Sequence, residues 1–209
     1  MTRKPWLMAA LLLAGAIPAA QAALPRNLDP DWPCMQIKVP ELSVAAVWAG
    51  PSVSAYRATW SQDADVADLA GRLVARRVSM QEAQAEIDDF AKTAGHDQQK
   101  LLALFAGVFQ LSNQERTSVL AGLDRFGKRQ KELAAQIRGE SAALSGLQAD
   151  ATPDVEKVGT AQNRLNWDLQ VFRNRTDSIH YACDAPALIE QRLFAVSRAI
   201  QAVLPQPGQ

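Results

Sequence analysis

Histidine and cysteine are scarce in this chain of 209 residues, which has two of each, and aromatic residues make up only 6% of it. The two histidines, His96 and His180, stand far apart, and neither has a metal-ligand or catalytic-triad pattern around it. The sequence also lacks nucleophile-elbow, P-loop, dinucleotide-binding, H-E-x-x-H and c-type haem motifs. We therefore predict a non-enzymatic protein with no catalytic residues, no metal site and no cofactor.

An excess of charge is also missing, because 22 basic residues face 22 acidic ones. A balanced chain has no general attraction for nucleic acid or for an anionic membrane surface. Short basic groups occur at residues 128–131 and 173–175, but a solvated helix face explains them better than a phosphate-binding track. We therefore do not expect a nucleic-acid partner.

Long apolar runs are absent after the first residues. Arg3 and Lys4 precede an apolar run over residues 6–17, and the Ala-Gln-Ala of residues 20–22 is typical of a signal-peptidase cleavage site. The run is too short for a bilayer span of about 20 residues. We therefore predict a signal peptide over residues 1–22, no stable membrane insertion after its cleavage, and a periplasmic or secreted mature chain.

The two cysteines, Cys34 and Cys183, both lie in the predicted mature part. An oxidising compartment and an even count without C-x-x-C spacing favour one structural disulfide. Two free buried thiols and catalytic thiols are the alternatives. Cys34 lies in a proline-rich segment that cannot form a regular helix, so the disulfide would fix that segment to the rest of the fold.

Helix-forming residues are abundant, and the fold class predicted is all-α. Residues 23–60 form an irregular arm rich in proline and tryptophan, with a short helix from Pro40 through Trp48 or, less favoured, a strand over 42–48. Residues 61–209 form the helical domain. Its first helices span 61–77, then a segment opened by the capping box at residues 79–82, and then residues 97–111.

The longest periodic stretch predicts an antiparallel helical hairpin over residues 113–180, with arms of about 113–148 and 153–180. A second capping box at residues 112–115 opens the first arm, and Thr152 with Pro153 opens the second. Apolar residues alternate at spacings of four and three, as in a coiled-coil seam. The predicted hairpin core contains Leu123, Phe126, Leu133, Ile137, Leu144, Leu147, Val155, Val158, Leu165, Leu169 and Phe172.

The two arms are mirror images in their numbering, because opposite residues such as 137 and 165 have numbers that add to 302. This relation predicts a short-loop hairpin with an exposed tip near residues 147–155. Within the seam, Glu140 opposite Gln162 would fix the register. A separate C-terminal helix is expected over residues 186–203, beginning at Pro186, and Trp32 would pack on the core near the disulfide.

These features favour an exported helical interaction or scaffold protein of the bacterial envelope, which docks a protein partner on its hairpin by helix-in-groove or bundle-completing contacts. The alternative is a periplasmic protein that binds a small ligand or a metal ion through its N-terminal region. The residues of that possible ligand region are Asp29, Asp31, Trp32, Trp48, Tyr56 and Trp60.

Overall fold

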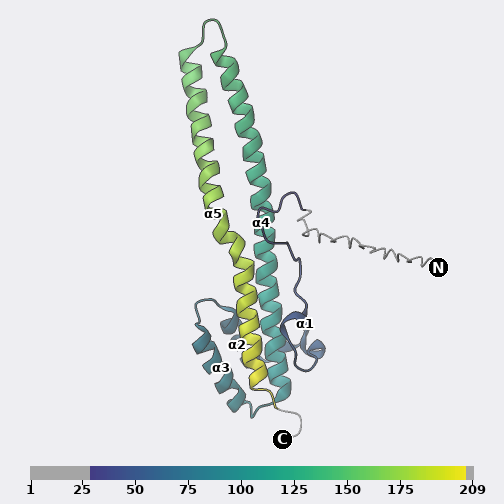
Figure 1. Cartoon of the computed structure of the whole chain (residues 1–209). Helices are drawn as coiled ribbons and strands as arrows, with labels where there is room; N and C mark the ends of the chain where they lie inside the picture. The colour runs from purple at the N-terminus through teal and green to yellow at the C-terminus, as the bar shows by residue number, and fades with distance from the viewer. Residues whose placement is uncertain (1–28, 206–209) are drawn as a thin grey trace, which may run out of the picture.

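The computed structural model describes residues 29–205, and the predicted signal peptide lies outside them. Two long antiparallel helices dominate it: α4 (Gln98–Gln148) and α5 (Val155–Ala202) (Figure 1). The shorter elements are α1 (Val44–Val47), the 3-10 turns η1 (Ser54–Tyr56) and η2 (Trp60–Gln62), α2 (Ala64–Val74) and α3 (Met80–Thr93). No strand occurs in this range, so the all-α prediction with a long helical hairpin is confirmed.

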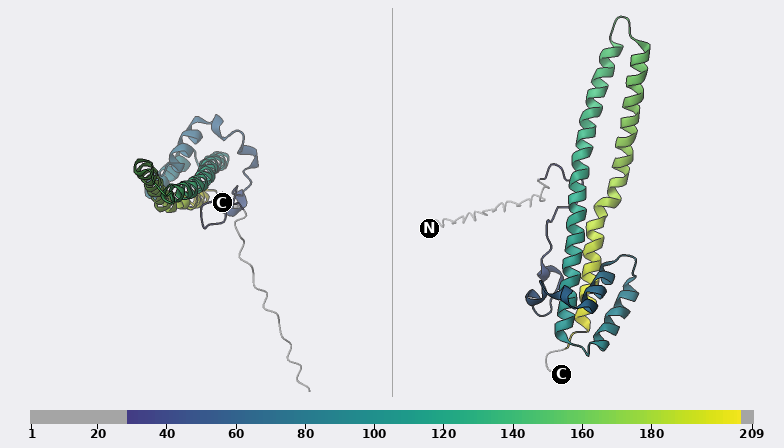
Figure 2. Two further views of the ribbon diagram at one scale, coloured as in Figure 1. Left: turned by 90° about the horizontal axis from the view of Figure 1, so that it is seen from above. Right: turned by 180° about the vertical axis from the view of Figure 1, so that it is seen from behind.

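The molecule has a thick base and a long projecting rod. Figure 1 and the right view of Figure 2 show α2 and α3 beside the lower ends of α4 and α5. Above the level of the N-terminal arm, the two long helices have only each other as neighbours among the described residues. At a rise of about 1.5 Å per residue, the 51 residues of α4 span roughly 75 Å. Across residues 29–205, none of the helices combines the length and the apolar composition that a bilayer span requires.

Two predicted helix boundaries were wrong, since neither Ser112 nor Pro186 begins a helix. Ser112 lies inside α4 and is only 4% exposed, and the buried Pro186 lies inside α5. The reason is that the seam continues below the predicted hairpin. The pairs 116 with 186, 109 with 193 and 102 with 200 keep the sum of 302, and all six of these residues are buried.

Pro186 leaves a local mark on α5 without ending it. Proline lacks the backbone N–H that would bond the carbonyl of Ala182, and its ring crowds that carbonyl, at a cost of about 3 kcal/mol. Burial of the following segment, from Ile189 to Ile200, in the core of the base outweighs this cost. α5 bends near the middle of its length (Figure 1), which is the usual response of a helix to an internal proline.

The core of the base surrounds the first turns of α4, where residues 101–109 are all buried. Trp48 is 7% exposed and stacks on Phe105 with ring centroids 3.9 Å apart. Its indole N–H donates to the carbonyl of Pro51 at 2.8 Å. The predicted helix from Pro40 is reduced to α1, because the chain must turn there to bring Trp48 onto α4.

Helices α2, α3 and α5 each begin after a residue whose side chain caps the first turn. The capping box of Ser79 and Glu82 is confirmed, and Asp63 accepts backbone N–H bonds at the start of α2. At the rod's tip the cap is Asp154, which bonds the N–H groups of residues 156 and 157, so the prediction of Thr152 and Pro153 was wrong by two residues. These cap bonds hold the pKa of both Asp63 and Asp154 below the usual range for a carboxyl group.

The irregular N-terminal arm lies along α4 and is joined to α5 by the predicted disulfide between Cys34 and Cys183, which is confirmed. The backbone carbonyl oxygen of Asp31 approaches Gly127 so closely that a Cβ built there would lie 1.8 Å from it. Lys131 donates to the carbonyl of Pro30 and pairs with Asp31 at 3.1 Å. The position of the arm against α4 therefore requires a residue without a side chain at position 127.

Candidate docking groove on the hairpin

The seam between α4 and α5 follows the predicted register. Leu123, Leu144 and Leu165 are buried, and the amide nitrogen of Gln130 donates to the carbonyl of Phe172 at 3.0 Å, a pair whose numbers add to 302. Of the predicted hairpin-core residues, Leu123, Leu144 and Leu165 are buried, and a second group is half-buried: Phe126, Leu133, Ile137, Leu147, Val158, Leu169 and Phe172. Val155 is 84% exposed, because it lies in the first turn of α5 beyond the last layer.

A polar network crosses the rod where the sequence suggested a register-fixing pair. Glu140 accepts from Arg164 at 2.8 Å and from Gln136 at 3.0 Å, and these hydrogen bonds, that from Gln136 first, hold the pKa of Glu140 below its usual range. Gln162, the expected partner of Glu140, instead donates to Asn166 on its own helix. The longer side chain of Arg164 reaches across the seam and takes that place.

Each side of the seam has a different cover. In heptad notation the seam residues occupy positions a and d, and the two flanks are formed by positions e and g. The arm covers the e side, which includes Gly127, as far as Lys131. Nearer the tip the e residues Ser141, Gly159 and Asn166 are exposed. On this side the ammonium group of Lys38 bonds Asp29 at 2.6 Å and Asp124 at 2.8 Å, and it lies 5.5 Å from the ring of Trp32.

The g side is covered at the base. There the opposite g residues Val108 and Val196 are 1% and 0% exposed and share a core with Leu69 and Leu73 of α2. This cover ends at the connection between α2 and α3, where Arg192 donates to the carbonyls of Leu73 at 2.7 Å and Val78 at 2.8 Å. Above that level, the g side of the rod is open.

Opposite g residues in the open part have numbers that add to 304, and they form an ordered series. From the base toward the tip the pairs are Gly122 with Ala182, Arg129 with Arg175, Gln136 with Asp168, and Ala143 with Ala161. The hydrogen bond of 2.8 Å between Gln136 and Asp168 supports this pairing. The series therefore runs small, basic, polar, small. We call this open strip the g-side groove.

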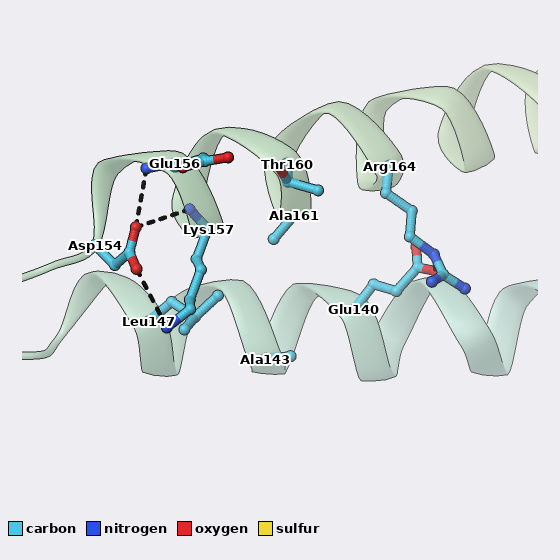
Figure 3. A pocket seen from close by; sticks show the side chains of 9 residues that line it. All are labelled: Glu140, Ala143, Leu147, Asp154, Glu156, Lys157, Thr160, Ala161 and Arg164. Carbon is cyan, nitrogen blue, oxygen red and sulfur yellow. Dashed lines mark hydrogen bonds and ion pairs between the residues drawn. The ribbon is translucent and has the colours of Figure 1, made fainter.

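The surface is hollowed at both small pairs. The lower hollow, of about 590 Å³, is lined by Gly122 and Ala182 together with Phe126 and Tyr181. The upper hollow, of about 610 Å³, is lined by Ala143, Ala161 and Leu147. Its other lining residues are Thr160 and five charged residues: Glu140, Asp154, Glu156, Lys157 and Arg164. Figure 3 shows the upper hollow between the two helices, with Ala161 pointing from α5 toward α4.

Two exposed aromatic side chains occupy f positions on the outer face of α5, and one of them, Tyr181, also lines the lower hollow. Trp167 is 67% exposed and Tyr181 is 82% exposed, and the two residues lie two heptads apart on one helix face. The spacing of the seam alone does not require large apolar residues at these outer positions. Sequence reasoning missed them and the g-side groove, although the heptad numbering that would have located both was already available.

The middle of the groove is basic. Arg129 and Arg175 occupy opposite g positions and are exposed, and neither guanidinium forms an ion pair with a carboxylate of residues 29–205. Residues 125–132 hold four basic side chains and one acidic side chain. This level of the rod therefore attracts an external carboxylate.

The structure does not bring the six residues of the possible ligand region together. Trp48, Tyr56 and Trp60 pack at the base, where the indole of Trp60 donates to the side chain of Gln110 at 2.8 Å. The other three residues lie on the arm, further up α4. Trp32 is half-buried and is not part of the core, and Asp29 and Asp31 form ion pairs with Lys38 and Lys131. In the described part of the chain, no three histidine, cysteine, aspartate or glutamate side chains are grouped to hold a metal ion.

Comparisons with known proteins give no relative: the chain matches no protein-family model, and no curated protein or solved structure is significantly similar to it.

Proposed function

We propose that this chain is an exported, non-enzymatic interaction or scaffold protein of the bacterial envelope, which docks a protein partner on its projecting hairpin. The observation that carries the proposal is the bare g side of the rod, with its two hollows and the exposed ring of Tyr181 at the lower one. Exposed apolar surface of this kind typically marks a site of protein interaction.

The construction of the rod supports a docking role. Its seam is already closed, because the apolar seam residues of the two helices are buried or half-buried between them, and the base and the disulfide hold it at its lower half. A helix pair that is already ordered adds little ordering cost when a partner binds. The disulfide also favours an oxidising compartment outside the cytoplasm.

Photo-cross-linking with a bacterial envelope extract tests the proposal. Benzoylphenylalanine is placed at Tyr181, which lines the lower hollow of the rod, or, as the matched control, at Arg57 on the exposed surface of the base. We expect one dominant adduct from position 181 and none of the same mass from position 57. The captured protein is then purified and titrated into the unmodified chain by calorimetry, where a saturable heat of defined stoichiometry is expected. Adducts from the base alone, or no heat of binding, would contradict a docking role for the hairpin.

A further inference from the structure

We infer that the g-side groove takes an amphipathic helix of the partner, with two apolar anchor residues three heptads apart and an acidic residue one heptad from one anchor. This inference rests on the proposed function and specifies the partner's chemistry.

A helix is the occupant that continues an interface the molecule already has. At the base, the g side is filled by apolar residues of α2, which pack on Val108 and Val196. The uncovered part begins directly above the connection between α2 and α3, on the same side of the same two helices. A further helix placed there would extend the bundle upward along the rod, with its apolar side facing the groove.

The anchor spacing follows from the two hollows. Gly122 and Ala143 mark them on α4 and are 21 residues apart, which corresponds to three heptads and roughly 30 Å along a helix axis. Small residues at these g positions leave room for a large side chain from a facing helix, such as leucine or phenylalanine. The partner's anchors must therefore repeat the same three-heptad interval.

The acidic residue follows from the basic pair. Arg129 and Arg175 lie one heptad above Gly122 and Ala182, and a carboxylate placed between them would bond two guanidinium groups. One heptad higher, Gln136 and Asp168 already bond each other, so an acidic residue there would face Asp168. The charge pattern thus favours an acid next to the lower anchor and a neutral residue next to the upper one.

Two synthetic peptides of 28 residues serve as probes in fluorescence anisotropy titrations of the intact protein. Both have leucine at positions 4 and 25 on a background of alanine and glutamine, with glutamate at position 11 in one and at position 18 in the other, which covers both directions of binding. A third peptide has lysine in place of the glutamate. We expect saturable binding of one glutamate peptide and at least about tenfold weaker binding of the lysine peptide.

Matched charge reversals locate the contact. Arg175→Glu should weaken binding of the glutamate peptide at least about tenfold and strengthen binding of the lysine peptide. Arg173→Glu, on the e side two residues away, should change neither affinity by more than about twofold. Filling the lower hollow by Ala182→Trp should also weaken binding. Both arginines and Ala182 are exposed in the structure, so circular dichroism should confirm unchanged helix content for all three variants.

The inference fails if neither glutamate peptide binds, or if Arg173→Glu and Arg175→Glu have equal effects. It also fails if sedimentation shows a dimer that Arg175→Glu dissociates, because the groove would then hold a second copy of this chain. The proposed function is judged separately by the cross-linking experiment: a partner captured at position 181 whose affinity is unchanged by Arg175→Glu would leave the docking role intact and refute the acidic helix.

Discussion

The contact between the arm and α4 makes Gly127→Ala an informative substitution. The new Cβ would lie 1.8 Å from the carbonyl oxygen of Asp31, so the arm must retreat by roughly 1.5 Å to reach an ordinary contact of about 3.4 Å. Overpacking of this kind costs about 1–3 kcal/mol. Alanine regains about 1 kcal/mol of helix propensity relative to glycine. We therefore expect a net loss of up to about 2 kcal/mol in the free energy of unfolding.

The matched control is Gly139→Ala in the same helix. A Cβ at residue 139 would meet nothing within 4 Å, so only the propensity gain applies and the free energy of unfolding should rise by about 0.5–1 kcal/mol. Urea denaturation followed by circular dichroism at 222 nm measures both variants. The same chemical change should thus move the urea midpoint in opposite directions at the two positions.

The disulfide provides a further check on the cause. Without the bond to Cys183 the arm can lift away from α4, so Gly127→Ala should lose most of its cost in a background that carries Cys34→Ser and Cys183→Ser. The coupling energy in this cycle should be about 1 kcal/mol or more. If Gly127→Ala raises the midpoint as Gly139→Ala does, the arm does not contact α4 as described, and the reasoning is refuted.

Three further predictions concern stability. Cys34→Ser with Cys183→Ser opens a loop whose ends are 149 residues apart and should lower the free energy of unfolding by up to about 5 kcal/mol in urea titrations; a loss under 1 kcal/mol would contradict a structural role. Bonding to Lys38 keeps the pKa of Asp29 low, so this carboxylate contributes stability above about pH 4 that is lost as pH falls further; Asp29→Asn should flatten that pH dependence, and an unchanged profile would exclude the pair. Trp48→Ala should lower stability by about 3–5 kcal/mol, measured by the same titration, since the ring is buried in the base; a change below 1 kcal/mol would show that the stack is dispensable.

The hairpin was predictable because its seam is periodic over many turns. The spacing of four and three over both arms fixes which residues face each other, and the sum of 302 fixes the register, as the contact of Gln130 with Phe172 confirms. The disulfide followed from the count and setting of two cysteines. Each arm contains its own heptad spacing, so the register of the hairpin can be predicted without tertiary information.

The continuity of the helices was not predicted because local signals were given more weight than the seam. The residues around Ser112 fit a capping box, and Pro186 resembles a first helical residue. The heptad pattern nevertheless passes through both positions, and burial against the opposite helix decides the outcome. Following the sum of 302 beyond the predicted hairpin would have joined the helices correctly.

The path of the arm and the position of the g-side groove depend on tertiary structure. Nothing local to Gly127 indicates that a carbonyl from residue 31 packs on it, and the open side of the rod is defined only once the arm and α2 occupy their places. Two arginines that look like ordinary solvated residues in the sequence become a facing pair when the register is known.

A photo-cross-linking scan of α5 tests the docking surface most directly. Benzoylphenylalanine is introduced singly at each position from 171 to 180, and the yield of adduct with the captured envelope partner is measured. We predict maxima at positions 171, 175 and 178, which line the g-side groove, and little adduct at 173, 177 and 180. A uniform yield, or maxima at 173 and 180 on the side of the arm, would contradict docking in the groove.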